Sequence, residues 1–144
     1  MDKDKILGAL IGVAVGDALG MPEEFTTNRS NYTGLVREHT KHNQFMGPRT
    51  LPAGQCTDDT EMMMVLLRHL AEGEYDQKTI TERYIEWANS GQTMRGRNTS
   101  ALLYGIKTYK GYLGRRAKVF PDEKTMEQAQ SNGALMRCAP LALL

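Results

Sequence analysis

The sequence predicts an all-α protein, and three observations favour this class. Apolar residues recur at spacings of three and four in several segments, as amphipathic helices require. The first such segment has a glycine at every fourth position, a pattern typical of a helix packed closely inside a helical interior. Only one short strand is expected, around Leu35 and Val36. The 144 residues can form the core of one domain, and no linker or internal repeat divides residues 1–144.

The first expected helix covers residues 3–20. Its four glycines form one slowly turning groove, because four residues advance about 40° past a full helical turn: Gly8, Gly12, Gly16 and Gly20. Each glycine costs about 1 kcal/mol relative to alanine in a helix interior. We therefore expect a second backbone to fit closely into the groove, and the helix to be buried.

The rest of the chain is expected to alternate loops and helices. Residues 21–54 lack a sustained period and are rich in Pro, Gly, Asn and Thr, which predicts a long loop. Apolar periodicity and capping residues then predict four helices. The first two cover residues 58–72, ending at Gly73, and residues 78–89. The third is capped by Asn98 and ends near Gly111, and the last begins after Ser131 or Asn132.

Charge, cysteine content and hydropathy exclude several functional classes. Lys and Arg number 18 against 17 Asp and Glu, so the chain lacks the overall positive field of a nucleic-acid-binding protein. Cys56 and Cys138 are far apart, which favours a reducing, cytoplasmic compartment. Acidic residues near the start and Asp17 argue against a secretory signal, and no segment reaches the ~18 apolar residues needed to span a membrane.

A basic segment has two interpretations. Five lysines and arginines lie between Lys107 and Lys118, with Tyr109 and Tyr112 among them. A solvated helix end is the favoured interpretation, because cations complement the C-terminal end of a helix dipole. A phosphate-binding surface is the other.

The stretch GQCTDDTE precedes the apolar run of the helix expected at residues 58–72. Thr57 or Asp58 can cap that helix, and Glu61 stands three residues after Asp58, so the stretch can be an ordinary helix start. A cap uses only one side-chain oxygen, however. Together Thr57, Asp58 and Asp59 offer an all-oxygen set of the kind that binds Mg²⁺, Mn²⁺ or Ca²⁺.

Two further polar stretches can accompany that set. GDALGMPEEF contains Asp17, Glu23 and Glu24, and Glu24 lies at the mouth of the long loop, where it is either a cleft residue or an exposed loop acid. In SNGALMR, a small polar helix start at residues 131–133 can present backbone N–H groups to an anion or a sugar hydroxyl. An ordinary helix cap is the alternative there.

In this order, the stretches GVAVGDALGMPEEF, GQCTDDTEMM and SNGALMRCAPLAL resemble the ADP-ribosylglycohydrolase family. The resemblance spans nearly the whole chain. It implies an all-α fold with two Mg²⁺ or Mn²⁺ ions in a cleft, and hydrolysis of the glycosidic bond at C1″ of ADP-ribose in an ADP-ribosylated protein.

The resemblance also implies roles for individual residues. Thr57, Asp58 and Asp59 would be metal ligands, and Glu24 would act with Asp58 and Asp59 at the reacting centre. ADP-ribose would be contacted by Ser131, Asn132 and Gly133, with Met136 and Arg137 supporting them from behind.

Two departures from the family pattern bear on activity. The segment SGQTMRGRNTS contains no acid, although family members commonly have an aspartate there. The family also implies a longer chain with a second acidic metal cluster, and nothing after Asn132 is acidic. We therefore expect the N-terminal half of such an enzyme, completed by a complementary C-terminal chain or by self-association. The alternative is an inactive short relative that binds ADP-ribose, a nucleotide or a protein partner.

Overall fold

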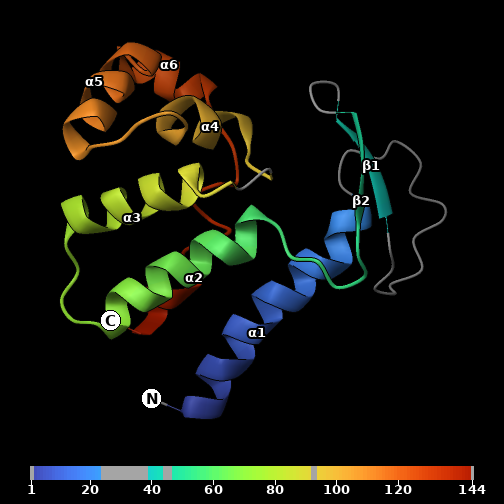
Figure 1. The fold of residues 1–144 in the computed structure, drawn as a ribbon. Coiled ribbons are helices and arrows are strands. Elements are labelled where there is room, and N and C mark those ends of the chain that lie inside the picture. Colours follow the sequence, from blue (N-terminus) through green and yellow to red (C-terminus); the bar gives the residue numbers. More distant parts are fainter. Residues whose placement is uncertain (1, 24–38, 44–46, 92–93, 144) are drawn as a thin grey trace. The chain divides into compact units, whose positions relative to one another are not determined.

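The computed structural model describes residues 2–23, 39–43, 47–91 and 94–143, and Figure 1 shows their helices and hairpin. They belong to two compact units, Met1–Thr60 and Glu61–Leu144. The predicted all-α class is confirmed, because the described residues form six α-helices and a single two-stranded hairpin. None of the described helices has the length and apolar character needed to cross a membrane.

The first unit begins with the predicted glycine-rich helix, α1 (Lys3–Gly20), followed by the 3₁₀ turn η1 (Met21–Glu23). The Asp2 side chain caps α1 by accepting a hydrogen bond from the Asp4 N–H. The expected burial of α1 is wrong, because Ala18 is its only described residue that is buried. A methyl group added at any of the four glycines would meet no other described atom within 4 Å. Nothing in the described chain fills the groove.

A β-hairpin replaces part of the predicted loop. Strand β1 (His39–Asn43) pairs antiparallel with β2 (Gly47–Leu51), with His39 opposite Leu51. The two strands lack alternating hydrophobicity, and β2 contains Pro48, a residue rare in strands, so periodicity could not indicate them. The strand expected at Leu35 and Val36 lies outside the described residues.

Helices α2 (Asp58–Ala71) and α3 (Gln77–Asn89) match their predicted boundaries closely. The Asp76 side chain caps α3 by accepting from the Thr79 N–H at 2.7 Å. The residues on the apolar side of α3 are buried: Ile80, Tyr84, Ile85, Trp87 and Ala88.

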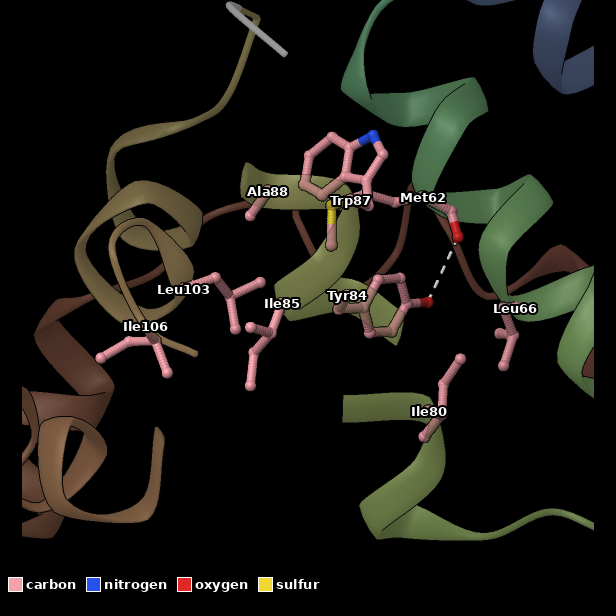
Figure 2. Packing of buried hydrophobic residues seen from close by; sticks show 9 residues of the cluster. All are labelled: Met62, Leu66, Ile80, Tyr84, Ile85, Trp87, Ala88, Leu103 and Ile106. Atoms are coloured by element: carbon pink, nitrogen blue, oxygen red, sulfur yellow. Dashed lines mark hydrogen bonds between the residues drawn. The ribbon is translucent and has the colours of Figure 1, made fainter. Parts of the chain in front are cut away.

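The core of the second unit forms where these buried residues meet Met62 and Leu66 of α2 and Leu103 and Ile106, as Figure 2 shows. Two polar side chains in this region have defined partners. The Tyr84 hydroxyl donates to the Met62 carbonyl at 3.2 Å, and the Trp87 indole N–H donates to the Glu61 carboxylate at 2.8 Å.

The helix predicted from Asn98 to Gly111 is divided in two, α4 (Arg97–Leu103) and α5 (Tyr109–Val119). Gly105 turns the chain at φ 75°, a left-handed conformation that favours glycine. The side chain of Asn89 holds this turn by donating to the Leu103 and Ile106 carbonyls and accepting from the Gly105 N–H. Asn98 does not cap α4, since the cap position is Gly96.

The end of the chain also differs from expectation. A short helix that the sequence did not indicate, α6 (Glu123–Gln128), begins at an Asp122 cap, and the Asn98 amide donates to the Ala129 carbonyl just after it, at 2.6 Å. Residues 132–137 form turns, and the 3₁₀ helix η3 (Ala139–Leu143) follows, so the α-helix predicted after Ser131 or Asn132 is wrong. Pro140 cannot donate the backbone hydrogen bond that a regular helix needs there.

Candidate functional site

Asp17, near the end of α1, accepts hydrogen bonds from the start of α2 through both of its carboxylate oxygens. Its Oδ2 accepts three hydrogen bonds, from the Thr57 N–H at 2.8 Å, the Thr60 N–H at 3.1 Å and the Thr60 hydroxyl at 2.6 Å. Its Oδ1 accepts one from the Thr57 hydroxyl at 2.7 Å. We call this group of Asp17, Thr57 and Thr60 the Asp17 clamp.

The Asp17 clamp caps α2 from another helix. The first N–H groups of a helix have no partner within it, and a carboxylate there also complements the helix dipole. The sequence predicted a cap from within the motif, yet the acceptor for Thr57 and Thr60 is 40 or more positions earlier in the chain. A weaker contact joins the same segments, with the Cys56 thiol 3.7 Å from the Ala14 carbonyl.

The three predicted metal ligands are consecutive at this helix start. Thr57 is buried, while Asp58 and Asp59 are partly buried. Because a carboxylate can only accept, the Thr57 hydroxyl hydrogen points to Asp17, and its oxygen lone pairs remain available. This all-oxygen donor set fits Mg²⁺ or Mn²⁺ chemistry.

The ligand set is incomplete within the part of the chain that the structure describes. No group of three or more His, Cys, Asp or Glu side chains there could hold a metal ion. Glu24, the predicted carboxylate at the reacting centre, lies outside the described residues. Its place relative to the Asp17 clamp therefore stays a prediction.

A cavity of about 740 Å³ lies in the second unit, and three of the five predicted ADP-ribose residues line it: Ser131, Gly133 and Arg137. Asn132 and Met136 are not among its lining residues, and Met136 packs against the core instead. Ser131 and Gly133 belong to a turn region, so the helix N-terminus expected there as an anion site does not form.

Arg137 supports the cavity wall from the core side. Its guanidinium carbon lies 4.8 Å from the centre of the Tyr84 ring, and its Nη1 lies 3.8 Å from the Met62 sulfur. Burial raises the pKa of Tyr84 to about 12, and the positive charge of Arg137 opposes that rise. Tyr84 is therefore a neutral hydrogen-bond donor at physiological pH, and it lines the same cavity.

Sequence reasoning missed how Asp17 and Thr60 are used. It grouped Asp17 with Glu23 and Glu24 as one further carboxylate, and it assigned no role to Thr60. A usable signal was present, because Asp17 is the single acid in the apolar run between Ile6 and Leu19 and therefore needs a polar partner.

Comparison with known proteins identifies the family. The model of the ADP-ribosylglycohydrolase family matches residues 1–144. An ADP-ribosyl-[dinitrogen reductase] glycohydrolase from Rhodospirillum rubrum is 37% identical over 143 residues, covering 97% of this chain and 44% of the relative. The ADP-ribosylarginine hydrolases Tri1 of Pseudomonas putida and Serratia proteamaculans are each 30% identical, covering 97% of this chain and 36% of the relative.

The chain thus spans less than half the length of these curated relatives. Its matched portion is nonetheless the whole of the present sequence, and all three stretches GDALG, TDDT and NGALMR fall within it. The chain belongs to the ADP-ribosylglycohydrolase family.

Proposed function

We propose that this chain is the part of a metal-dependent hydrolase that contains the first metal cluster and part of the ADP-ribose site. The reaction is cleavage of the N- or O-glycosidic bond at C1″ of ADP-ribose in a modified protein. Family membership supports this proposal, as do the names of the relatives, one an ADP-ribosyl-[dinitrogen reductase] glycohydrolase and another an ADP-ribosylarginine hydrolase.

In the proposed site, Thr57, Asp58 and Asp59 hold Mg²⁺ or Mn²⁺. The bound ion would orient the ribose hydroxyls and the attacking water. Glu24 would accept a proton from that water as it attacks C1″, in the role that a carboxylate base has in glycoside hydrolysis. The direction of the Thr57 hydroxyl favours this arrangement. Its hydrogen is donated to Asp17, so its oxygen can face an ion.

The single observation that best supports ADP-ribose as the ligand is the cavity beside Arg137. Its volume of about 740 Å³ is in the usual range for small-molecule sites. Its lining includes the aromatic rings of Tyr112 and Phe120, against which a nucleobase can stack, and the guanidinium of Arg137, which suits a phosphate. Ser131 and Gly133 line the cavity and would contact the sugar or the phosphates. Asn132 does not line it, so its contact with ADP-ribose is proposed from the family resemblance alone.

The proposal predicts metal-dependent release of ADP-ribose from an ADP-ribosylated arginine peptide. The measurement uses this chain mixed with the C-terminal part of a family member, with Mn²⁺ or Mg²⁺ added and then removed by a chelator. Asp58→Ala should abolish turnover. Glu74→Ala, which removes the same charge at an exposed position, should not.

Failure of the mixture to release ADP-ribose, with both chains folded, would refute the catalytic proposal. Calorimetric binding of ADP-ribose under the same conditions would then point to the alternative, an inactive binding protein. The cytoplasmic location stays a prediction; Cys56 and Cys138 are both free thiols.

We also propose that a second polypeptide covers one face of α1, either a copy of this chain or a complementary C-terminal part. Leu7, Ile11 and Val15 recur every four residues on α1 and are each at least half exposed, at 56%, 52% and 50%. The four glycines beside them are open to close approach. Exposed apolar surface of this kind marks an interaction site.

A further inference from the structure

We propose that Asp17 is a positioning residue for the metal site, which acts by fixing the direction of the Thr57 hydroxyl hydrogen. This inference rests on the proposed function, because it gives Asp17 a role toward the ion that Thr57 would bind. It goes beyond the predicted ligand set of Thr57, Asp58 and Asp59. Asp17 itself contacts no ion in this proposal.

The argument begins with the hydrogen-bond chemistry of Thr57. A hydroxyl has one hydrogen and two lone pairs, whereas a carboxylate has only lone pairs. In the 2.7 Å contact between Thr57 Oγ1 and Asp17 Oδ1, the hydrogen must therefore lie on the side of Asp17. The lone pairs of Oγ1 can then face a cation. A hydroxyl hydrogen that pointed toward the cation would repel it.

The rest of the Asp17 clamp keeps this arrangement in place. Two backbone N–H groups and the Thr60 hydroxyl converge on Asp17 Oδ2, so the carboxylate cannot rotate without losing three hydrogen bonds. Oδ1 is thereby held toward Thr57. Thr57 is buried, so water cannot easily replace Asp17 as the acceptor.

Asp17→Asn separates positioning from capping. In the variant, the amide oxygen must take the place of Oδ2, because the two backbone N–H groups there can only donate. The amide NH₂ then faces Thr57 Oγ1, which becomes an acceptor and turns its hydrogen away from residue 17. The helix cap survives, since Asn caps helices as well as Asp does, while one lone pair of Thr57 is lost to the ion.

The test is Mn²⁺ binding to the 144-residue chain mixed with the C-terminal part of a family member, measured by calorimetry and by the electron paramagnetic resonance signal of free Mn²⁺. Asp17→Asn should weaken binding by about tenfold or more, the usual effect of losing a group that orients a metal ligand. The matched control is Asp122→Asn, which makes the same substitution at the cap of α6 and leaves the Asp17 clamp untouched. It should bind Mn²⁺ as the wild type does.

A double-mutant cycle shows whether Asp17 acts through Thr57. Thr57→Val should weaken Mn²⁺ binding, and adding Asp17→Asn to Thr57→Val should weaken it no further, because the hydroxyl to be oriented is gone. Full additivity of the two effects would overturn the inference. Wild-type Mn²⁺ affinity in Asp17→Asn would also overturn it. If Asp17→Asn fails to fold, wild-type Mn²⁺ affinity in Thr57→Val would overturn it.

The failure of the proposed function gives a different result. If the wild-type mixture binds no more Mn²⁺ than the C-terminal part does alone, the proposed metal site and the positioning role that depends on it are both refuted. If the wild type and Asp17→Asn bind equally, the metal site stands and only the positioning role is refuted. Circular dichroism and thermal melting of each variant confirm that folded proteins are compared.

Discussion

At the scale of single residues, Tyr84 belongs both to the hydrophobic core and to the wall of the candidate cavity. Its hydroxyl donates to the Met62 carbonyl, and its ring faces the Arg137 guanidinium. Any change at Tyr84 therefore affects packing and the site together. The same holds for Arg137, which the sequence placed in a supporting role.

The buried phenol of Tyr84 predicts a specific response to alkaline pH. Because the folded state raises its pKa to about 12, its stabilising effect is complete below the ordinary tyrosine value of about 10 and is lost as the pH rises through the folded value. In an absorbance titration of tyrosinate, Tyr84→Phe should remove the last step to ionise. Tyr104→Phe, at a residue that is 57% exposed, should leave that step in place.

The Asp17 clamp and the Asn89 side chain show why the sequence indicates candidate residues more readily than their hydrogen-bond partners. Thr57, Asp58 and Asp59 are predicted as metal ligands because side-chain oxygens are in surplus at one helix start, and this stays a prediction. Their acceptor on α1 could not be found from spacing, because it depends on how two distant segments pack. Likewise, Asn89 holds a turn at Gly105 that periodicity alone does not indicate.

At the scale of elements, the helices predicted most closely are those with local punctuation. α1 and α3 each begin at an aspartate cap, and α3 also has a continuous apolar side. The region from Asn98 to Gly111 has equally good periodicity, but Thr108 caps a new helix inside it, by accepting from the Gly111 N–H at 3.1 Å. The hairpin β1–β2 is held by backbone pairing between strands without a periodic pattern, so it was missed.

The cap of α3 predicts an acid-sensitive helix start. Hydrogen bonds from the side chain and backbone of Thr79 lower the pKa of Asp76 below its ordinary value of 3.8. The stabilisation is thus complete above that ordinary value and is lost as the pH falls through the lowered one. Asp76→Asn should retain the cap and make the melting temperature less dependent on pH in this acidic range. An unchanged dependence, measured by circular dichroism, would contradict the prediction.

At the scale of the whole molecule, the glycine groove of α1 is open among the described residues. Gly12→Ala should stabilise the isolated chain by about 1 kcal/mol, because alanine favours helix and the added methyl meets no described atom within 4 Å. Gly114→Ala in α5 should give a similar gain, for the same reason. Thermal and denaturant unfolding measure both.

The two glycine variants should differ in association. If a second polypeptide fits into the groove, the Gly12→Ala methyl should weaken association in analytical ultracentrifugation, while Gly114→Ala should not. A wild-type chain that is monomeric at high concentration, alone and with a complementary C-terminal part, would contradict the proposed partner. Equal association of both variants would exclude the groove as its site.

The hydrogen bond between Trp87 and Glu61 makes the start of α2 optically observable. Trp87 is the single tryptophan of the chain, so its fluorescence needs no assignment. Its indole N–H is bonded to Glu61, one helical turn after Asp58. A change in charge or geometry at residues 57–61 should therefore alter the emission spectrum, giving an intrinsic, label-free signal for events at the motif.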